Sequence, residues 1–307
     1  MGLRNILLIL FTILSGSCAA PLEEITPPAN GSFYSYDGVR IHFEDMGSGR
    51  PLVFIHGFAA SIDSWRFLVE PFKKDYRLVL LDLKGHGYSD RPADARYSPR
   101  DHADVVIGLI KSLQLSHVIL VGHSFGSAVA LLAALEAHHS EPDLVSGVIL
   151  FAGSVDPYHL PFLLRALRVP VIGWLGMKLT SASFRTRMAL KKAYYDDSKI
   201  TDSLVEMYAK YQHIPGTDHA LLETAKAFVP PNLFELKQQL KDLNIPVVNI
   251  HGEQDKVISR KSPEEVCMLI SRCRFVTVEG AGHIPQEERP DEIVPLFGAM
   301  VRGMPDK

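Results

Sequence analysis

Short apolar runs alternate along the chain with longer segments in which apolar residues recur at helical spacing. Four continuous apolar runs are typical of strands buried on both faces, at residues 52–55, 78–81, 118–121 and 148–151. Residues 247–250 predict a further strand of the same kind. Residues 39–44 alternate between apolar and polar, and residues 275–278 predict one more strand. Helical spacing predicts helices at 61–73, 101–113 and 127–137, from Pro263 and from Asp291.

This order of elements predicts an α/β fold with a mostly parallel central sheet and helices on both faces. From about residue 155 to residue 240, helical patterns follow one another without a convincing strand. We therefore expect a core made of residues 33–154 and 241–307, interrupted by a helical cap at 155–240.

The first twenty residues have the three parts of an export signal: Arg4, an uncharged apolar run at 6–14, and small residues after it. The run is shorter than the roughly 20 residues that span a bilayer. The alternative to an export signal is a short N-terminal anchor that stays attached. Cys18 is a candidate lipidation site, although Leu14 stands one residue too far upstream for a lipobox. The alternative is cleavage after residue 19 or 20 without lipidation. We expect an exported protein that is periplasmic, extracellular or anchored through its N-terminus, with a Pro-rich tether at 21–32.

Composition narrows the classes of function. With 47% apolar and 22% charged residues, the 307-residue chain is globular rather than disordered. A net charge of −3 gives no global basic excess for binding nucleic acid, so no nucleic-acid partner is expected. Three cysteines are too few for a disulfide scaffold. Whether Cys267 and Cys273 pair stays open, because helix geometry could keep them apart.

A G-x-S-x-G motif, residues 122–126, directly follows the predicted strand at 118–121 and opens a helix. Such a turn lifts the serine hydroxyl above the edge of the sheet in strained backbone geometry. Side chains two residues to either side would collide, and glycine avoids this collision. Ser124 is therefore the candidate nucleophile.

A serine hydroxyl needs a base, and His283 follows the last predicted strand in a Gly-rich loop. Asp255 follows the preceding strand and could orient the imidazole; Asp156, after the strand at 148–151, is a rival acid. Backbone N–H groups of Phe58 and Phe125 are candidate donors to an oxyanion.

Other histidines are assigned structural roles. His56 and His86 are interpreted as loop-bracing residues, and His123 as a neighbour of the nucleophile rather than its base. The sequence has no H-E-x-x-H motif, P-loop or Rossmann glycine pattern, so we expect neither a metal nor a nucleotide cofactor.

Taken together, these motifs resemble the α/β-hydrolase superfamily, in its capped branch, over roughly residues 39–151 and 245–301. The motifs that carry the resemblance are His56-Gly57-Phe58 and residues 82–90, 122–126, 252–255 and 282–283. The resemblance implies a Ser124–His283–Asp255 triad with a lid over it. Epoxide hydrolases and haloalkane dehalogenases of this fold carry aspartate where Ser124 stands. Carbon–carbon bond hydrolases usually have Asn-Ser-Met-Gly-Gly in place of residues 123–127.

The expected function is a serine esterase-like or lipase-like hydrolase that cleaves an ester or related acyl bond through an acyl-enzyme. Carbon–carbon bond hydrolysis on the same residues is the first alternative, and a non-catalytic binding protein the second. Residues 158–195 hold seven Lys or Arg and no carboxylate, among large apolar residues. Their apolar side is expected to line the pocket of an acyl or aromatic small-molecule substrate. Alternatively, this basic stretch rests on an anionic membrane surface.

Overall fold

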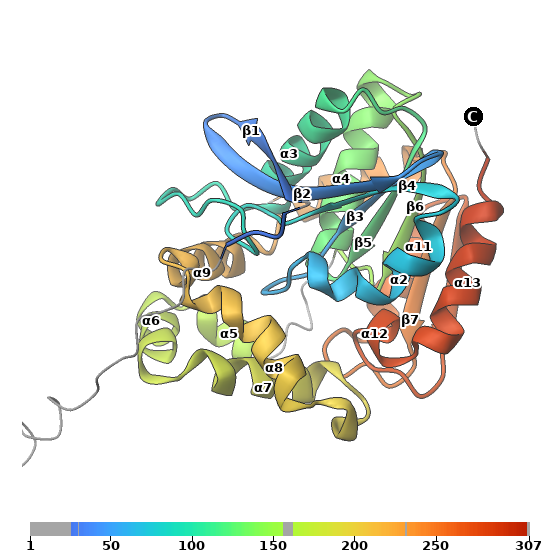
Figure 1. The fold of residues 1–307 in the computed structure, drawn as a ribbon. Helices are drawn as coiled ribbons and strands as arrows, with labels where there is room; N and C mark the ends of the chain where they lie inside the picture. Colours follow the sequence, from blue (N-terminus) through green and yellow to red (C-terminus); the bar gives the residue numbers. More distant parts are fainter. Residues whose placement is uncertain (1–25, 30, 156–161, 231, 306–307) are drawn as a thin grey trace, which may run out of the picture.

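A computed structural model describes residues 26–29, 31–155, 162–230 and 232–305. An eight-stranded sheet forms its centre, in the order β1-β2-β4-β3-β5-β6-β7-β8 (Figure 1). The strands are β1 (Gly31–Tyr36), β2 (Val39–Gly47), β3 (Arg50–Ile55), β4 (Tyr76–Leu81), β5 (Val118–His123), β6 (Val145–Phe151), β7 (Val247–Gly252) and β8 (Cys273–Val278). The strands from β3 to β8 pair in parallel, whereas β1 and β2 pair antiparallel, which confirms the mostly parallel sheet.

The register brings the carboxyl ends of the parallel strands to one edge. Ile55 pairs with Gly122, and Gly252 with Val278. The loops that follow β3, β5, β7 and β8 therefore leave the sheet side by side, which is where ligands bind in α/β folds.

Helices cover both faces of the sheet. In β3, Val53 and Ile55 pack on one side, and Leu52 and Phe54 on the other. This alternation explains why the central strands carry continuous apolar runs. Figure 1 shows α3 (Pro99–Ser112) and α4 (Phe125–Ser140) on the first side. Helix α11 (Lys261–Leu269) packs on the same side. On the second side lie α2 (Arg66–Phe72) and α13 (Pro290–Arg302).

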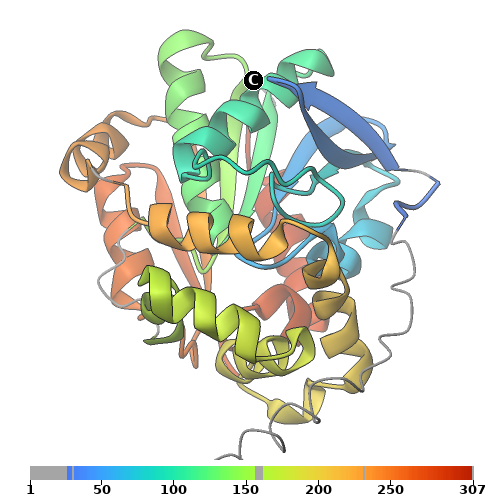
Figure 2. The ribbon, with the colours of Figure 1, turned by 90° about the vertical axis from the view of Figure 1, so that its left-hand side faces the viewer.

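Between β6 and β7 the described chain is helical. Its elements are α5 (Phe162–Leu167), α6 (Pro170–Leu179), α7 (Ala182–Ala193), η2 (Asp197–Lys199), α8 (Asp202–Ala209), η3 (Lys210–His213), α9 (Thr217–Ala227), α10 (Leu233–Gln239) and η4 (Leu240–Asp242). Leu236 and Leu240 pack in the core of the sheet domain, so we use the word cap for α5 to α9 only. In Figure 2 these cap helices lie below the strands. Within the described residues, no helix is long and apolar enough to cross a membrane.

Three local features differ from the sequence-based expectation. β1 was not predicted, and it includes Gly31 and Ser32, which the sequence analysis assigned to the tether. β1 belongs to the sheet because it pairs with β2, and not because of a local apolar pattern. The helix expected at 61–73 is divided into η1 (Ile62–Trp65) and α2.

The chain reverses direction after α11, and this reversal brings Cys267 and Cys273 into a disulfide with Cα atoms 4.9 Å apart. The question that the sequence left open is thereby answered. The predicted export signal with Cys18, half of the tether and the rival acid Asp156 lie outside the described residues.

Candidate active site

Ser124 stands at the tight turn between β5 and α4, with φ 51° and ψ −115°. A positive φ is uncommon for a residue with a Cβ, and the strain is typical of functional turns. A Cβ on Gly122 would lie 2.5 Å from the Gly126 carbonyl oxygen, and a Cβ on Gly126 would lie 2.2 Å from that of Ile55. Only glycine fits at both positions, as the motif predicted.

The three residues predicted to act together meet in one hydrogen-bonded line. His283 Nε2 lies 2.8 Å from the Ser124 hydroxyl oxygen, and His283 Nδ1 lies 2.8 Å from Asp255 Oδ2. The other carboxylate oxygen of Asp255 accepts N–H groups of Val257 and Ile258. This geometry fits proton transfer from Ser124 to Nε2, with Asp255 holding the proton on Nδ1.

Electrostatics keep Asp255 ionised. Burial by itself would raise the pKa of this carboxyl group. The neighbouring His283, which bonds and interacts with it electrostatically, outweighs burial, and the pKa of Asp255 is lowered. A buried carboxylate is therefore available to stabilise an imidazolium ion on His283.

The main chain of His283 is held from two sides. Its N–H donates to the Ala193 carbonyl of the cap at 2.6 Å. Its carbonyl accepts from His123 Nε2 at 2.9 Å. Burial and the proximity of His283 lower the pKa of His123 to about 3, so its ring is neutral at physiological pH. His123 is thus a neighbour of Ser124, as expected, but its contact with His283 was not predicted.

Glu288, at the end of α12 (Pro285–Glu288), joins the His283 loop to the cap. One carboxylate oxygen accepts the N–H of Gly282 at 2.6 Å. The other accepts the N–H groups of Tyr195 and Asp196 at 2.8 and 2.7 Å. Glu288 is fully buried. The sequence carried no signal for this contact, because Glu288 lies in an ordinary charged run after Pro285.

Phe58 and Phe125 offer the backbone donors that the sequence analysis named. Among the hydrogen bonds of the described residues, neither N–H has a protein acceptor. Phe125 is the first residue of α4, where the helix dipole places partial positive charge. Two unused N–H groups beside Ser124 could stabilise a developing oxyanion.

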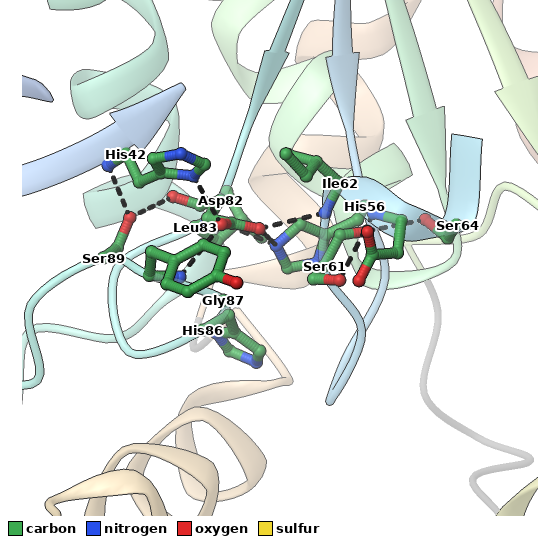
Figure 3. Close-up of polar contacts among 12 residues, drawn as sticks. His42, His56, Ser61, Ile62, Ser64, Asp82, Leu83, His86, Gly87 and Ser89 are labelled. Carbon is green, nitrogen blue, oxygen red and sulfur yellow. Dashed lines mark hydrogen bonds and ion pairs between the residues drawn. The ribbon is translucent and has the colours of Figure 1, made fainter. Parts of the chain in front are cut away.

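A buried polar cluster fastens the loop that carries Phe58 (Figure 3). Asp82 Oδ1 accepts the N–H of Ile62 at 2.9 Å, and Oδ2 lies 2.8 Å from His42 Nδ1. His56 lies at the other end of the loop. Its Nε2 accepts the N–H of Leu83, and its Nδ1 lies 2.8 Å from the Gly57 carbonyl oxygen. The loop is therefore tied down at both ends, which confirms the bracing role expected of His56.

Burial and the contacts within this cluster shift the pKa values of Asp82 and His56. Burial would raise the pKa of Asp82, but the hydrogen bond from His42 and the electrostatic interaction with His56 lower it overall. Burial lowers the pKa of His56. A Cβ on Gly87 would lie 1.9 Å from the Asp82 carboxyl carbon, so the chain needs glycine there. His86 is buried close by, and its Nδ1 lies 3.1 Å from the Lys84 carbonyl oxygen, in keeping with its expected role in the loop.

A small cavity opens on the Ser124 side chain. Its described lining is mostly apolar and consists of Ser124, Ala128, Ala152, Ser154, Val155, Phe228 and Ile258. Its free volume is about 10 Å³, roughly the room that one water molecule needs. Phe228, at the end of α9, lines the cavity from the side of the cap. Its ring lies 5.2 Å from that of Phe125. The described lining includes no residue of the stretch 158–195. The expectation that the apolar side of this stretch lines the substrate pocket stays a prediction.

Comparisons with known proteins agree with the fold. "Uncharacterized hydrolase YugF" of Bacillus subtilis (strain 168) is 28% identical over 265 residues, which cover 85% of this chain and 93% of the relative. The 2-hydroxymuconate semialdehyde hydrolase of Pseudomonas sp. (strain CF600) is 26% identical over 270 residues, covering 85% of this chain and 90% of the relative.

Among solved structures, a meta-cleavage product hydrolase from Pseudomonas fluorescens IP01 matches with a TM-score of 0.75 and 24% identity. The match covers 89% of this chain and 98% of that one. The family model described as "alpha/beta hydrolase fold" matches residues 50–290. The chain therefore belongs to the α/β-hydrolase family, and the two relatives named above are hydrolases.

Proposed function

We propose that this protein is a serine hydrolase that cleaves a carboxylic ester or related acyl bond through an acyl-enzyme. The observation that carries the proposal is the line from the Ser124 hydroxyl through His283 to Asp255, with 2.8 Å at each step. A serine with such a base and an ionised orienting acid is an activated nucleophile. A binding protein without catalytic activity would not need this set of residues at a strained turn.

In the proposed reaction, Ser124 Oγ attacks the carbonyl carbon while His283 Nε2 takes the hydroxyl proton. The N–H groups of Phe58 and Phe125 stabilise the oxyanion. The intermediate collapses when the bond to the leaving group breaks, and His283 protonates that group. Water then attacks the acyl-enzyme, His283 takes its proton, and the carboxylic acid leaves as Oγ regains a proton.

The apolar lining of the cavity supports an uncharged acyl group. Its described lining residues include no lysine or arginine. Burying a charge in such a site without a partner is costly, which argues against a charged acyl chain. We propose esters of uncharged acyl groups as the preferred substrates.

Carbon–carbon bond hydrolysis on the same residues is the second candidate. Its support is the similarity to 2-hydroxymuconate semialdehyde hydrolase, whose name indicates a muconate, which is a carboxylate, as its substrate. Two observations favour the ester reaction. The described cavity lining has no cation to pair with a carboxylate, and His123-Ser124-Phe125-Gly126-Ser127 departs from the usual motif of that subclass.

Labelling with a fluorophosphonate and hydrolysis of p-nitrophenyl esters of graded acyl length test this proposal. Wild-type protein should be labelled, and Ser124→Ala should lose labelling together with roughly a millionfold in kcat. Ser203→Ala, which alters an exposed serine of the cap, is the matched control and should behave as wild type. Esterase activity that survives in Ser124→Ala would refute the proposal. Faster cleavage of a 2-hydroxy-6-oxo-dienoate than of any ester would favour the second candidate.

We also propose that the chain is exported, on the strength of the tripartite pattern at residues 1–20. The mass of the mature protein purified from the producing cell tests this. A lipid-modified Cys18 at the new N-terminus indicates an anchored lipoprotein. An N-terminus at Ala20 or Pro21 indicates a soluble exported form, and an uncut chain in the cytoplasm would contradict export.

A further inference from the structure

The cap helix α6 presents its apolar side to solvent. The large side chains on this side are 40 to 78% exposed; they are Val171, Ile172, Trp174, Leu175 and Leu179. The helical period places these positions on one side and Gly173 and Met177, both buried, on the other. We call the five exposed residues the α6 face.

The orientation of α6 is fixed by its buried side. A Cβ on Gly173 would lie 2.5 Å from the Leu167 carbonyl oxygen and 2.7 Å from the Leu222 side chain of α9. Because α6 approaches its neighbours this closely through a glycine, it cannot rotate to bury the α6 face without steric clashes. Contiguous exposed apolar side chains of this kind mark interaction surfaces in soluble proteins.

Helix α7 repeats the pattern. Phe184 and Met188 are exposed, and Lys191 and Lys192 follow along the same stripe. Its other side is buried and consists of Ala182, Thr186, Leu190 and Ala193. Helices α6 and α7 therefore both turn large apolar side chains outward.

Unpaired positive charge accompanies these apolar faces. Lys178 pairs with Asp218 and Arg187 with Asp202. By contrast, four other cations of residues 158–195 have no carboxylate partner among the ion pairs of the described residues. These cations are Arg165, Arg168, Lys191 and Lys192. Residues 158–195 themselves contain no Asp or Glu.

We propose that the outward faces of α6 and α7 dock on an anionic lipid membrane. Exposed apolar residues, among them a tryptophan, enter the interface, and the unpaired cations meet lipid headgroups. Each such cation should strengthen binding roughly fivefold at low salt. A second copy of this chain fits less well, because a two-fold contact would place the same unpaired cations opposite one another. The proposal does not depend on the hydrolase chemistry.

Trp174 provides a local probe in the full-length chain. The protein has two tryptophans, and Trp65 is fully buried, whereas Trp174 is 55% exposed. Vesicles of brominated phosphatidylcholine, with or without phosphatidylglycerol, quench a tryptophan that enters the bilayer interface. Because quenching reports the position of Trp174, binding through the N-terminal residues does not produce the signal.

We expect Trp174 quenching with anionic vesicles, little with neutral ones, and loss of the signal in Trp174→Phe. Leu175→Glu with Leu179→Glu should abolish quenching, and Lys191→Glu with Lys192→Glu should weaken vesicle affinity more than tenfold. Met268→Glu is the matched control, since Met268 is 81% exposed outside the cap, and it should bind as wild type.

Three results would overturn the proposal, provided that circular dichroism shows each variant folded. The first is no quenching with anionic vesicles, and the second is equal quenching with both vesicle types. The third is a dimer in sedimentation equilibrium that Leu175→Glu with Leu179→Glu dissociates. That result would assign the face to a second copy of the chain.

Discussion

The sheet domain and the cap both contain helices with one apolar side, but these sides face opposite ways. Helix α3 turns Val106, Leu109 and Ile110 toward the sheet, where all three are buried. Helix α6 turns Trp174 and Leu179 toward solvent. Burial stabilises the first helix, while the second leaves its apolar surface exposed to solvent.

The two regions contribute different groups to the candidate active site. The sheet domain supplies Ser124, Asp255 and His283, whereas the cap supplies the Ala193 carbonyl and the Phe228 ring. This division indicates that the sheet domain determines the chemistry and the cap tunes position and access. The predictions below test that division, beginning with the largest expected effect.

Asp255→Asn should lower kcat/KM for a p-nitrophenyl ester about ten-thousandfold, because an amide no longer stabilises the imidazolium or selects the tautomer of His283. Asp202→Asn is the control, since its side chain is 89% exposed in the cap. Steady-state kinetics on both variants check the prediction. Near wild-type activity in Asp255→Asn would mean that another acid, such as Asp156, supports His283.

Glu288→Gln tests the junction between the two regions. The glutamine amide would place donors against the N–H of Gly282, so the His283 loop should shift. We expect kcat to fall ten- to a hundredfold with little change in KM. Glu292→Gln, at a partly exposed position of α13, should leave both constants unchanged. If Glu288→Gln changes only the free energy of unfolding, its role is structural rather than positional.

His102 makes the stability of the sheet domain depend on pH. Burial lowers its pKa from 6.5 to about 3. Below about pH 6.5 the unfolded chain therefore binds a proton that the folded chain does not, and folded stability falls as pH decreases toward 3. His102→Leu should lessen the loss of unfolding free energy between about pH 7 and pH 5 by about 2 kcal/mol.

Urea unfolding at several pH values measures this effect. His139→Leu, which replaces an exposed histidine, is the control and should keep the wild-type slope. An unchanged slope in His102→Leu would show that His102 does not carry this part of the pH dependence.

Phe228→Ala tests whether the cap sets access. Removing the ring enlarges the cavity at Ser124, so the ratio of kcat/KM for an octanoyl ester to that for an acetyl ester should rise about tenfold. Phe234→Ala, at a position 75% exposed, should not change the ratio. An unchanged ratio in Phe228→Ala would place the limit on acyl length elsewhere.

The sequence by itself predicted the parallel strands and the three residues of the candidate site. Strands buried on both faces are apolar at every position, and a tight turn at Ser124 admits only glycine at positions 122 and 126. Asp255 and His283 could be named because they follow consecutive strands, whose ends share one edge of the sheet. Their catalytic roles stay predictions until the variants are measured.

Only the tertiary structure decided what depends on long-range contact. β1 became a strand by pairing with β2, and Glu288 acquired its role from N–H groups of Gly282, Tyr195 and Asp196. The direction of the α6 face was decided in the same way. Helical periodicity shows that a helix has an apolar side, but the packing of Gly173 on its neighbours determines that this side points away from the protein.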